Sequence, residues 1–321
     1  MRAVRVSAPA TVDLVEAPPP KPGPGEVLVR VAAAALCATD RRLAARGCDP
    51  PRIPGHEAAG HLEDGTPVGV HPDVGCGHCA QCRTGLENRC GNRTSIGLDR
   101  DGGLAEWLAV PAGHAVPLAG LDPGIAPLLE PLACCVHALS LLEVRRREPA
   151  LVVGAGSMGT LCMWALQAGG ASVAVAQRSE ERRRLAASLG ADAVLGLDED
   201  PGARLGRAPT VAVVTAPGAE ALAWTLAKVA VGGRVHAFAG TSGGAPVDAN
   251  VVHYRHLTLL GSTGSTVGDY LRARDLAASG AVPLARLPRA RIPMQHVPAA
   301  LLGERDPREL KVIVDVEGAG Q

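Results

Sequence analysis

Four of the chain's nine cysteines fall within fifteen residues, 76-CGHCAQCRTGLENRC-90. Cys76, Cys79, Cys82 and Cys90 are separated by two, two and seven residues. Four thiolates this close in sequence can surround one Zn²⁺ as a tetrahedron, and such a closed site leaves no position for a substrate. An iron–sulfur cluster is the alternative that four cysteines can hold. The spacing therefore predicts a structural zinc site, with the chemistry elsewhere in the chain.

A metal that takes part in a reaction needs an incomplete set of protein ligands, so that a substrate oxygen can reach it. One thiolate, one imidazole and one carboxylate make such a set. The candidate side chains are Cys37 in LCATD, His56 and Glu57 in GHEAAG, and Glu130 in LEPLA. From spacing alone each is a weak signal, because a lone cysteine or histidine more often belongs to the core.

A glycine-rich motif, 154-GAGSMG-159, follows an apolar run and opens a helical pattern over 157-SMGTLCMWALQA-168. In a turn from strand to helix, Gly154 permits the tight bend, Gly156 lets the backbone approach a pyrophosphate, and Gly159 lets the helix pack closely on the strand. The N–H groups of the first helical turn then face the phosphates. The motif predicts a dinucleotide-binding site; an ordinary glycine-rich turn is the alternative.

The residues that follow the next predicted strand indicate which dinucleotide binds. A carboxylate there would bond the ribose 2′-OH of NAD, but the sequence has Gln177-Arg178-Ser179, with Arg182 and Arg183 just behind. Arginine binds phosphate oxygens in a bidentate way, so NADP(H) is favoured over NAD(H). The alternative is that these arginines form only the solvated face of a helix. The predicted cofactor contacts in this half are Gly154, Gly156, Ser157, Met158, Gly159, Gln177, Arg178, Ser179 and Arg182.

Two compositional halves must position these residues. Up to about residue 130 the chain is rich in Pro and Gly, with short alternating runs such as 26-EVLVRVAA-33, which predicts a mostly β domain. From about residue 150, apolar strands alternate with helical patterns, which predicts an α/β domain with a parallel, doubly wound sheet. The strands expected there are 151–153, 172–176, 192–195, 211–214, 235–239 and 258–261, with helices at 157–168, 180–189 and about 267–279. A final strand at 311–316 is expected to return to the first domain.

Composition narrows the class of protein. Thirty-two basic and thirty-two acidic side chains give a formal net charge of zero, which predicts neither a nucleic-acid partner nor an anionic membrane surface. The start lacks the pattern of a signal peptide, and no apolar stretch reaches the ~20 residues of a membrane span. We therefore expect a soluble, cytoplasmic protein. In a reducing cytosol clustered cysteines indicate metal more than disulfides, and nine cysteines cannot all pair within one chain.

Together these motifs resemble the zinc-containing medium-chain dehydrogenase/reductase superfamily, whose members include alcohol, polyol and threonine dehydrogenases. The matching pieces occur in the family's order and span nearly the whole chain. They are C-x-T-D at 37–40, G-H-E at 55–57, the four-cysteine lobe at 76–90, E-P-L at 130–132 and G-x-G-x-x-G at 154–159. Glu130 stands where alcohol dehydrogenases have a cysteine, which is similar to the polyol and threonine branch.

The resemblance implies the fold and the roles of the candidate residues. The fold would be a GroES-like, mostly β catalytic domain of residues 1–130 and 262–321, joined to a Rossmann domain of residues 131–261. Two zinc ions per chain are implied, one of them in the four-cysteine lobe. The implied roles at the other are Cys37, His56 and Glu130 as ligands, Glu57 as an alternate ligand, Thr39 as carrier of the substrate proton, Asp40 as a hydrogen-bonding support, and Lys311 as a contact of the cofactor phosphates.

The expected reaction is hydride transfer between the nicotinamide and a small-molecule alcohol or ketone. The E-P-L motif, Thr39 and the scarcity of aromatic residues favour a polyol, sugar or aminocyclitol. The hairpin at 61-HLEDGTPVGVHPDVG-75 is shorter than in the family and lacks its G-D-R-V-like turn, so the rim of the active site, and with it the substrate of a relative, does not carry over to this chain. The alternatives are an NADPH-dependent reductase of an enal or iminium and a catalytically silent nucleotide-binding interaction protein. The apolar strand 257-LTLLG-261 leads us to expect a homodimer or homotetramer.

Overall fold

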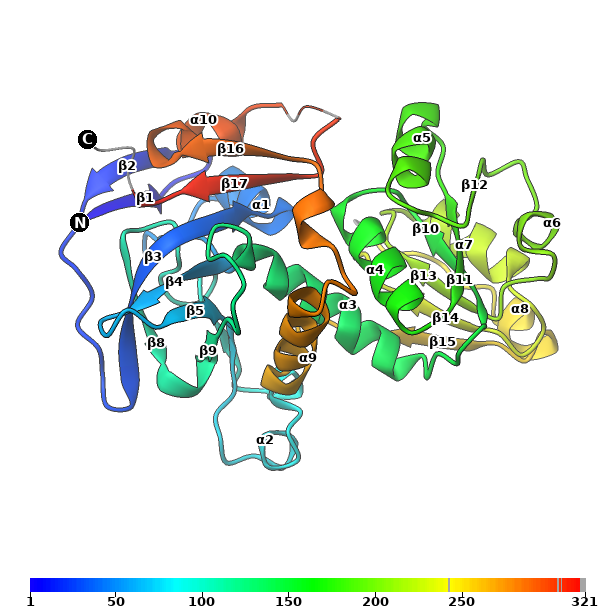
Figure 1. The fold of residues 1–321 in the computed structure, drawn as a ribbon, viewed down its shortest axis with the longest axis horizontal. Helices are drawn as coiled ribbons and strands as arrows, with labels where there is room; N and C mark the ends of the chain where they lie inside the picture. The colour runs from blue at the N-terminus through cyan, green and yellow to red at the C-terminus, as the bar shows by residue number, and fades with distance from the viewer. Residues whose placement is uncertain (242, 305, 307, 318–321) are drawn as a thin grey trace. The chain divides into compact units, whose positions relative to one another are not determined.

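The computed structural model describes residues 1–241, 243–304, 306 and 308–317 (Figure 1). It divides into two compact units. The first contains Met1–Ala133, Ser265–Ala278 and the described residues from Pro288 onward, and the second contains Cys134–Gly264 and Ser279–Leu287. Residues 279–287 thus cluster with the second unit, whereas the sequence analysis assigned the whole of 262–321 to the first domain.

The second unit is built on one six-stranded parallel sheet with the order β12-β11-β10-β13-β14-β15. This is the order of a doubly wound sheet that starts at a central strand and grows to both sides, so the predicted α/β class is confirmed. The strands are β10 (Pro149–Val153), β11 (Ser172–Ala176), β12 (Ala193–Leu195), β13 (Val211–Val214), β14 (Arg234–Ala237) and β15 (Thr258–Gly261). β10 and β13 are buried along their whole length, as expected for strands covered on both faces.

Helices cover this sheet where the chain crosses from one strand to the next (Figure 1). The helices of this half are α3 (Leu129–Leu141), α4 (Ser157–Ala168), α5 (Glu180–Ser188), α6 (Pro201–Leu205), α7 (Ala219–Lys228) and α8 (Ala249–Tyr254), with a 3₁₀ turn η4 (Leu284–Arg286). Ser179 caps α5 by accepting a hydrogen bond from the N–H of Arg182 at 3.3 Å, as its place before the helix predicts.

The first unit holds a mostly antiparallel sheet with the order β16-β17-β3-β4-β5-β9, in which β8 also pairs with β3. Its strands are β3 (Glu26–Leu36), β4 (Ala58–Leu62), β5 (Pro67–Val70), β8 (Trp107–Pro111), β9 (Ala115–Pro117), β16 (Arg289–Pro293) and β17 (Lys311–Asp315). Two small ribbons join β1 (Arg2–Val6) to β2 (Val12–Glu16) and β6 (Asp73–Val74) to β7 (Thr94–Ser95). Inward-facing valines and leucines of these strands form the core of the unit.

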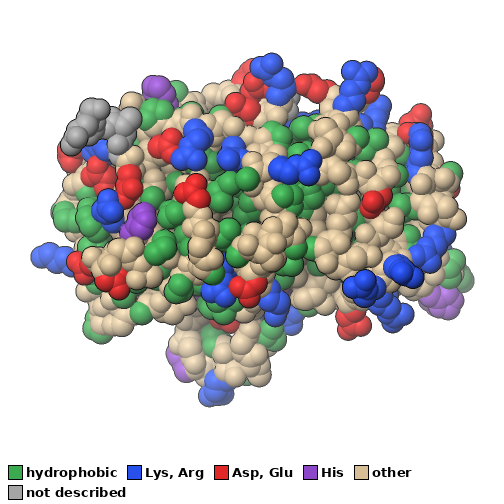
Figure 2. Space-filling view, viewed as in Figure 1, with side chains coloured by type: hydrophobic (Ala, Val, Ile, Leu, Met, Phe, Trp, Pro, Cys, Tyr) green, Lys and Arg blue, Asp and Glu red, His purple; other side chains and the backbone are tan. Residues whose placement is uncertain are grey.

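Short helices complete the first unit. They are α1 (Ala38–Arg46), α2 (Ala80–Arg83), α9 (Val267–Ala278) and α10 (Val297–Leu302), with 3₁₀ turns η1 (Glu87–Arg89), η2 (Ala112–His114), η3 (Ala126–Leu128) and η5 (Met294–His296). Among the residues that the structure describes, no helix has both the length and the apolar character needed to cross a bilayer. Positive and negative side chains are mixed over the face shown in Figure 2.

Candidate functional site

Three segments far apart in sequence meet at one end of the first unit's sheet. β3 runs antiparallel to β4 on one side and to β17 on the other. The end of β3 therefore meets the starts of both neighbours. Cys37 follows β3, His56 and Glu57 precede β4, and Lys311 opens β17. Strand register thus gathers a thiol, an imidazole, a carboxylate and an ammonium group from residues that the sequence keeps far apart.

One donor atom each from Cys37, His56 and Glu57 lies within 4.8 Å of the others. Thiolate, imidazole and carboxylate are the ligand types that zinc takes. The Oε2 atom of Glu57 is buried without a hydrogen-bond partner, which is the situation a bound cation would relieve. Glu130, the other predicted ligand, is buried in the first turn of α3 but does not belong to this close group. The residues present therefore fit a zinc ion.

Asp40 orients two of these residues. It is fully buried on α1, where its Oδ2 accepts a hydrogen bond from the N–H of Cys37 at 2.8 Å and its Oδ1 lies 3.3 Å from Nδ1 of His56. Burial acts to raise the pKa of Asp40, but the charge of His56 and the hydrogen bonds outweigh it and the pKa is lowered. Asp40 therefore stays ionised and holds Cys37 and His56 side by side.

Thr39 and Lys311, the remaining predicted residues of this site, have defined partners. The half-buried Thr39 accepts a hydrogen bond from Nη2 of Arg42 at 2.8 Å. The ammonium of Lys311 lies 2.5 Å from Oε1 of Glu57, and only 4% of its side chain is exposed. The resemblance implied a cofactor phosphate as the partner of Lys311, but the structure pairs it with a carboxylate beside the candidate ligands.

The four cysteines of the lobe also come together. One sulfur each from Cys76, Cys79, Cys82 and Cys90 lies within 4.8 Å of the others, and none of the four forms a disulfide. The Cys79–Cys82 and Cys76–Cys82 sulfur pairs are 3.5 and 4.0 Å apart. These separations match the roughly 3.8 Å edge of a tetrahedron with zinc–sulfur bonds of about 2.3 Å.

Backbone groups donate hydrogen bonds to cysteine sulfurs of the four-cysteine lobe. Hydrogen bonds from the backbone at His78 and Cys79 lower the pKa of Cys76 to about 6, whereas burial raises the pKa of Cys82 to about 12. Backbone N–H groups of Cys76 and Asn92 point at the sulfur of Cys90 at 3.4 and 3.3 Å. Such donors stabilise thiolates, which are the form that binds metal.

The second unit contains a pocket of about 600 Å³ at the carboxyl ends of its central strands. Gly154 has a φ of +109°, and a Cβ added to Gly159 would lie 1.8 Å from the carbonyl oxygen of Gly154. A Cβ on Gly156 would instead meet open space. The first and third glycines are thus required by the turn and by helix packing, while the second leaves backbone accessible to a ligand, as the motif predicts.

The arginines after β11 have different surroundings. Arg178 and Arg182 line the pocket together with Gln177. Arg183 does not line it: its Nη1 donates to the carbonyl oxygens of Gln177 and Arg178, both at 2.8 Å. Ser179 is occupied as the cap of α5. Arg178 and Arg182 are therefore the guanidinium groups in the pocket wall, where Nη1 of Arg182 also donates to the carbonyl oxygen of Ala155 at 3.5 Å, and Arg183 holds the turn that carries Arg178.

Sequence reasoning overlooked part of the pocket wall. Leu197 after β12 and Thr215 and Pro217 after β13 line the pocket, whereas the predicted contacts Ser157 and Met158 belong to α4 and are not in its wall. Thr215 donates to the carbonyl oxygen of Gly154 at 3.2 Å and so ties the two strand ends together. These pocket residues could have been predicted from the sequence, because residues just after each parallel strand meet at one edge of the sheet.

Comparison with known proteins agrees with both units. Residues 23–120 match the family "Alcohol dehydrogenase GroES-like domain", and residues 157–279 match the family "Zinc-binding dehydrogenase". D-altritol 5-dehydrogenase of Agrobacterium fabrum (strain C58) is 33% identical over an alignment of 335 residues, which covers 97% of this chain and 98% of that relative.

Two solved structures with bound nicotinamide cofactors share the fold. One, a short chain alcohol dehydrogenase from E. coli CFT073 complexed with NADH, gives a TM-score of 0.90 at 26% identity and covers 98% of this chain and 99% of its own. The other, a zinc-binding dehydrogenase from Sinorhizobium meliloti 1021 bound to NADP, gives 0.89 at 29% identity and covers 98% of each chain. The chain thus belongs to the zinc-containing medium-chain alcohol dehydrogenase family and is an oxidoreductase.

Proposed function

We propose that the protein is a zinc-dependent oxidoreductase that transfers a hydride between NADP(H) and a secondary alcohol or ketone of a polyol, sugar or aminocyclitol. The observation that carries the proposal is the gathering of Cys37, His56 and Glu57 within 4.8 Å. The name of the A. fabrum relative, a dehydrogenase of a polyol, supports the substrate class. Two ligand groups among the described residues suit two zinc ions per chain.

The proposed ligands of the catalytic zinc are Cys37, His56 and Glu130, with Glu57 as the alternate, while Cys76, Cys79, Cys82 and Cys90 hold the structural zinc. A zinc ion at the first site would supply Lewis acidity toward an alcohol or carbonyl oxygen. Glu57 already shares Oε1 with Lys311. We assign Glu130 as the resident ligand because the resemblance carried by E-P-L implies it, and Glu57, whose Oε2 has no hydrogen-bond partner, as the alternate.

The reaction also requires residues of the chain to transfer one proton. Oxidation takes a hydride from the carbinol carbon to the nicotinamide and a proton from the hydroxyl to solvent. Thr39 is the proposed carrier of that proton. Arg42 donates to its oxygen at 2.8 Å, which leaves the hydroxyl hydrogen free to pass onward. The reverse reaction uses the same groups in the opposite order.

The cofactor preference rests on the pocket of the second unit. The two solved relatives hold different dinucleotides, so the fold accepts both. Arg178 and Arg182 line the pocket of this chain. Position 177, where NAD-binding domains carry a carboxylate, is Gln177. Two guanidinium groups in the pocket wall, and an uncharged amide at position 177, favour the 2′-phosphate of NADP(H).

Zinc content and targeted variants test the proposal. Protein purified without chelator should contain two zinc ions per chain and should oxidise polyols with NADP⁺. Cys37→Ser or His56→Ala should remove one zinc and most turnover while leaving nucleotide affinity unchanged, because neither residue belongs to the second unit. Full turnover in these variants would contradict the ligand assignment. Turnover with an enal or iminium but no alcohol, or nucleotide binding without turnover, would favour the two alternatives.

We also propose a homodimer that pairs through β15. This strand ends the six-stranded sheet, and its Thr258 and Gly261 are exposed while Leu259 and Leu260 are half-buried. An apolar edge strand of this kind is prone to pair with a second copy. Size-exclusion chromatography with light scattering at micromolar protein should give twice the 32.7 kDa chain mass, or four times for a homotetramer. A monomer would exclude this assembly.

A further inference from the structure

The first unit contains a pocket of about 440 Å³ whose wall includes none of the residues assigned to either zinc ion or to the cofactor. Most of the wall comes from three segments: the proline-rich stretch 17-APPPKPGPG-25, the loop residues Arg52, Ile53 and 100–102, and the start of β8. Concave pockets of this size, mainly apolar with a few polar groups, are the usual sites of small molecules. Neither the fold nor the proposed function has so far accounted for this pocket.

Arg52 differs from the other half-buried arginines of this unit. Its side chain lines the pocket, yet within the described residues it makes neither a hydrogen bond nor an ion pair. Its backbone is fixed, because its N–H and carbonyl oxygen both bond to Val6, at 2.9 and 2.8 Å. The other half-buried arginines in the described part of the unit all have partners; they are Arg2, Arg41, Arg93, Arg100, Arg274 and Arg289. A guanidinium taken partly out of water without a counter-charge calls for an explanation.

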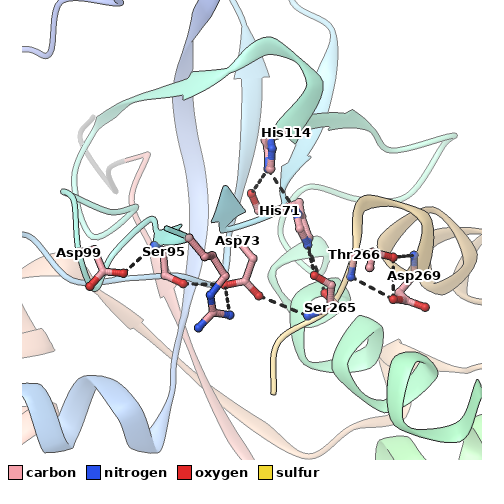
Figure 3. A network of polar contacts seen from close by, with 9 residues as sticks. His71, Asp73, Ser95, Asp99, His114, Ser265, Thr266 and Asp269 are labelled. Atoms are coloured by element: carbon pink, nitrogen blue, oxygen red, sulfur yellow. Dashed lines mark hydrogen bonds and ion pairs between the residues drawn. The ribbon is translucent and has the colours of Figure 1, made fainter. Parts of the chain in front are cut away.

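Figure 3 shows how a charge that serves the fold of this unit is paired. Oδ1 of Asp73 accepts hydrogen bonds from the hydroxyl of Ser95 at 2.6 Å and from Nη1 of Arg93 at 2.9 Å. Its Oδ2 accepts one from the N–H of Ser265 at 3.3 Å. Carboxylate and guanidinium there neutralise each other within the protein, whereas the charge of Arg52 is left for a group from outside.

Two more donors of the pocket wall are unused. Among the described residues, neither the ammonium of Lys21 nor Nε1 of Trp107 has a hydrogen-bond partner. The ammonium offers three N–H donors and the indole offers one, and neither group can accept. Together with the guanidinium of Arg52 they form a set of donors with two positive charges, which is suited to an anion.

The acidic side chains of the wall are already engaged. Glu26 forms an ion pair with Arg100 at 2.5 Å, and Asp101 accepts the N–H of Ile53 at 2.9 Å. Neither carboxylate lies within ion-pair distance of the two unpaired cations of the wall. A bound anion would therefore meet those cations without having to displace a carboxylate of the protein.

The apolar part of the wall indicates the shape of the ligand. Pro18 and Pro20 carry rigid rings and no N–H group, so this stretch offers apolar surface without backbone donors. Trp107 adds a half-buried ring, and the following Leu108 and Ala109 are buried. Because the face of an aromatic ring stacks on other planar groups, the pocket suits an anion that carries a flat ring.

One side of the pocket is joined to the segment that carries His56. The N–H of Gly102 donates to the carbonyl oxygen of Ile53 at 2.8 Å. A Cβ on Gly102 would lie 2.5 Å from the carbonyl oxygen of Gly55, and one on the neighbouring Gly97 would lie 2.7 Å from the backbone nitrogen of His56. The two stretches of backbone are thus in direct contact, with no side chain between them, and a ligand that fixes one also restrains the other.

We propose that this pocket is a second ligand site of the protein, which binds a small organic anion with a flat ring, and that the bound anion stabilises the segment that carries His56. Arg52 and Lys21 bind the anionic group, and Trp107 and the proline rings contact the ring of the ligand. The inference goes beyond the proposed function and does not depend on it, because no residue of the wall is assigned to zinc or to the nucleotide. It accounts for the half-buried position of Arg52 without an ion pair.

Calorimetric titration of the purified protein with benzoate tests the site. Benzoate has a flat ring and a negative charge, and benzamide has the same ring without the charge. Phenyl phosphate is titrated in parallel, because phosphate is the other anionic group that a guanidinium binds well. The variants are Arg52→Gln and Lys21→Gln, each of which removes one charge. Arg5→Gln is the matched control, since Arg5 is exposed on β1 and lies outside the pocket wall.

We expect at least one of the two anions to bind, and benzamide to bind at least about tenfold more weakly. Arg52→Gln should weaken anion binding by about tenfold or more, the worth of one hydrogen bond to a charged group, and Lys21→Gln should weaken it too. Arg5→Gln should bind the anion like the wild type. Failure of both anions to bind, equal binding of benzamide, or equal affinity in Arg52→Gln and wild type would overturn the site.

Hydrogen exchange tests the effect on the segment that carries His56. The N–H of Leu104, which lies outside the pocket wall, donates to the carbonyl oxygen of Pro54 at 3.0 Å. With the anion at about one hundred times its Kd, exchange of this amide should slow by more than about tenfold, because opening the segment then requires loss of the ligand. Arg52→Gln at the same anion concentration should show less slowing. Unchanged exchange in a wild type that binds the anion would overturn this effect alone and leave the site.

Discussion

The ammonium of Lys311 lies 2.5 Å from Oε1 of Glu57, across 254 residues of sequence, and both side chains are almost wholly buried. Burial acts to lower the pKa of Lys311, but the charges of Glu57 and Cys37 outweigh it and the pKa is raised. Lys311 therefore stays charged, and the two buried side chains depend on each other because neither has water to solvate it. The pair ties β17 to the segment that carries the candidate ligands.

Removing one partner of this pair should destabilise the protein strongly. Lys311→Met leaves the Glu57 carboxylate buried and uncompensated, which costs about 3–5 kcal/mol of unfolding free energy. Adding Glu57→Gln should restore much of the loss, because the buried carboxylate that lost its counter-charge is then removed as well. Urea denaturation measures the unfolding free energy of both variants. The control is Arg184→Ala, which breaks an ion pair with Glu180 in which both side chains are exposed, and it should lower the unfolding free energy by less than about 1 kcal/mol. An equally small loss in Lys311→Met would show that the buried charges are not interdependent.

Loss of one lobe cysteine should cost one metal and local order. In Cys90→Ser three thiols remain, and a structural zinc site with three ligands no longer holds the loop closed. Elemental analysis should show one zinc fewer per chain, and limited proteolysis should cut between residues 76 and 90. Cys48→Ser is the control, since Cys48 is half-buried outside both ligand groups. Unchanged zinc content in Cys90→Ser would show that the four-cysteine lobe is not a metal site.

Acid should destabilise the fold through His71 before its carboxylates are protonated. Burial and the neighbouring His114 lower the pKa of His71 to about 4. Above pH ~6.5 the histidine is neutral in both states, but below it only the unfolded chain takes up the proton, so the unfolding free energy falls from pH ~6.5 to ~4 by up to about 1.4 kcal/mol per unit. Denaturation at several pH values should show this slope, and His71→Gln should flatten it.

The exposed His253 provides the matched control for that experiment. His253→Gln should leave the slope as it is in the wild type. Asp73 and Glu87 also face His71, and both act to raise its pKa. An equal slope in His71→Gln and wild type would mean that other groups, such as His114, carry the acid sensitivity.

Much of the second unit could be predicted from sequence because its signals are local. The run 172–176 is β11 with the same bounds, and Ser179 caps α5 as its position before the helix predicts. For the first unit, the sequence predicted the fold class and the motifs but not the contacts between side chains. Lys311 meets Glu57 only because β17 lies beside β3, and that register depends on pairing between strands that no local pattern specifies.

The same limit applies to the arginines after β11. The six residues 178–183 carry three guanidinium groups, and the sequence does not say which of these groups face a ligand. The structure separates them: Arg178 and Arg182 line the pocket, and Arg183 bonds the turn. Helix periodicity alone cannot make this distinction, since it depends on how the turn bends back on its own carbonyl groups.

That division of roles leads to a test of cofactor preference. Arg178→Ala and Arg182→Ala should each raise KM for NADPH by about tenfold or more and leave KM for NADH nearly unchanged, because a charge-assisted contact to the 2′-phosphate is worth roughly 1.5–3 kcal/mol. Arg183→Ala should weaken both cofactors and lower stability, since it frees two carbonyl groups of the turn. Arg184→Ala, one residue further along α5 and outside the pocket wall, should change neither KM. Equal losses for NADPH and NADH in Arg178→Ala and Arg182→Ala would contradict recognition of the 2′-phosphate and would leave the preference to other residues.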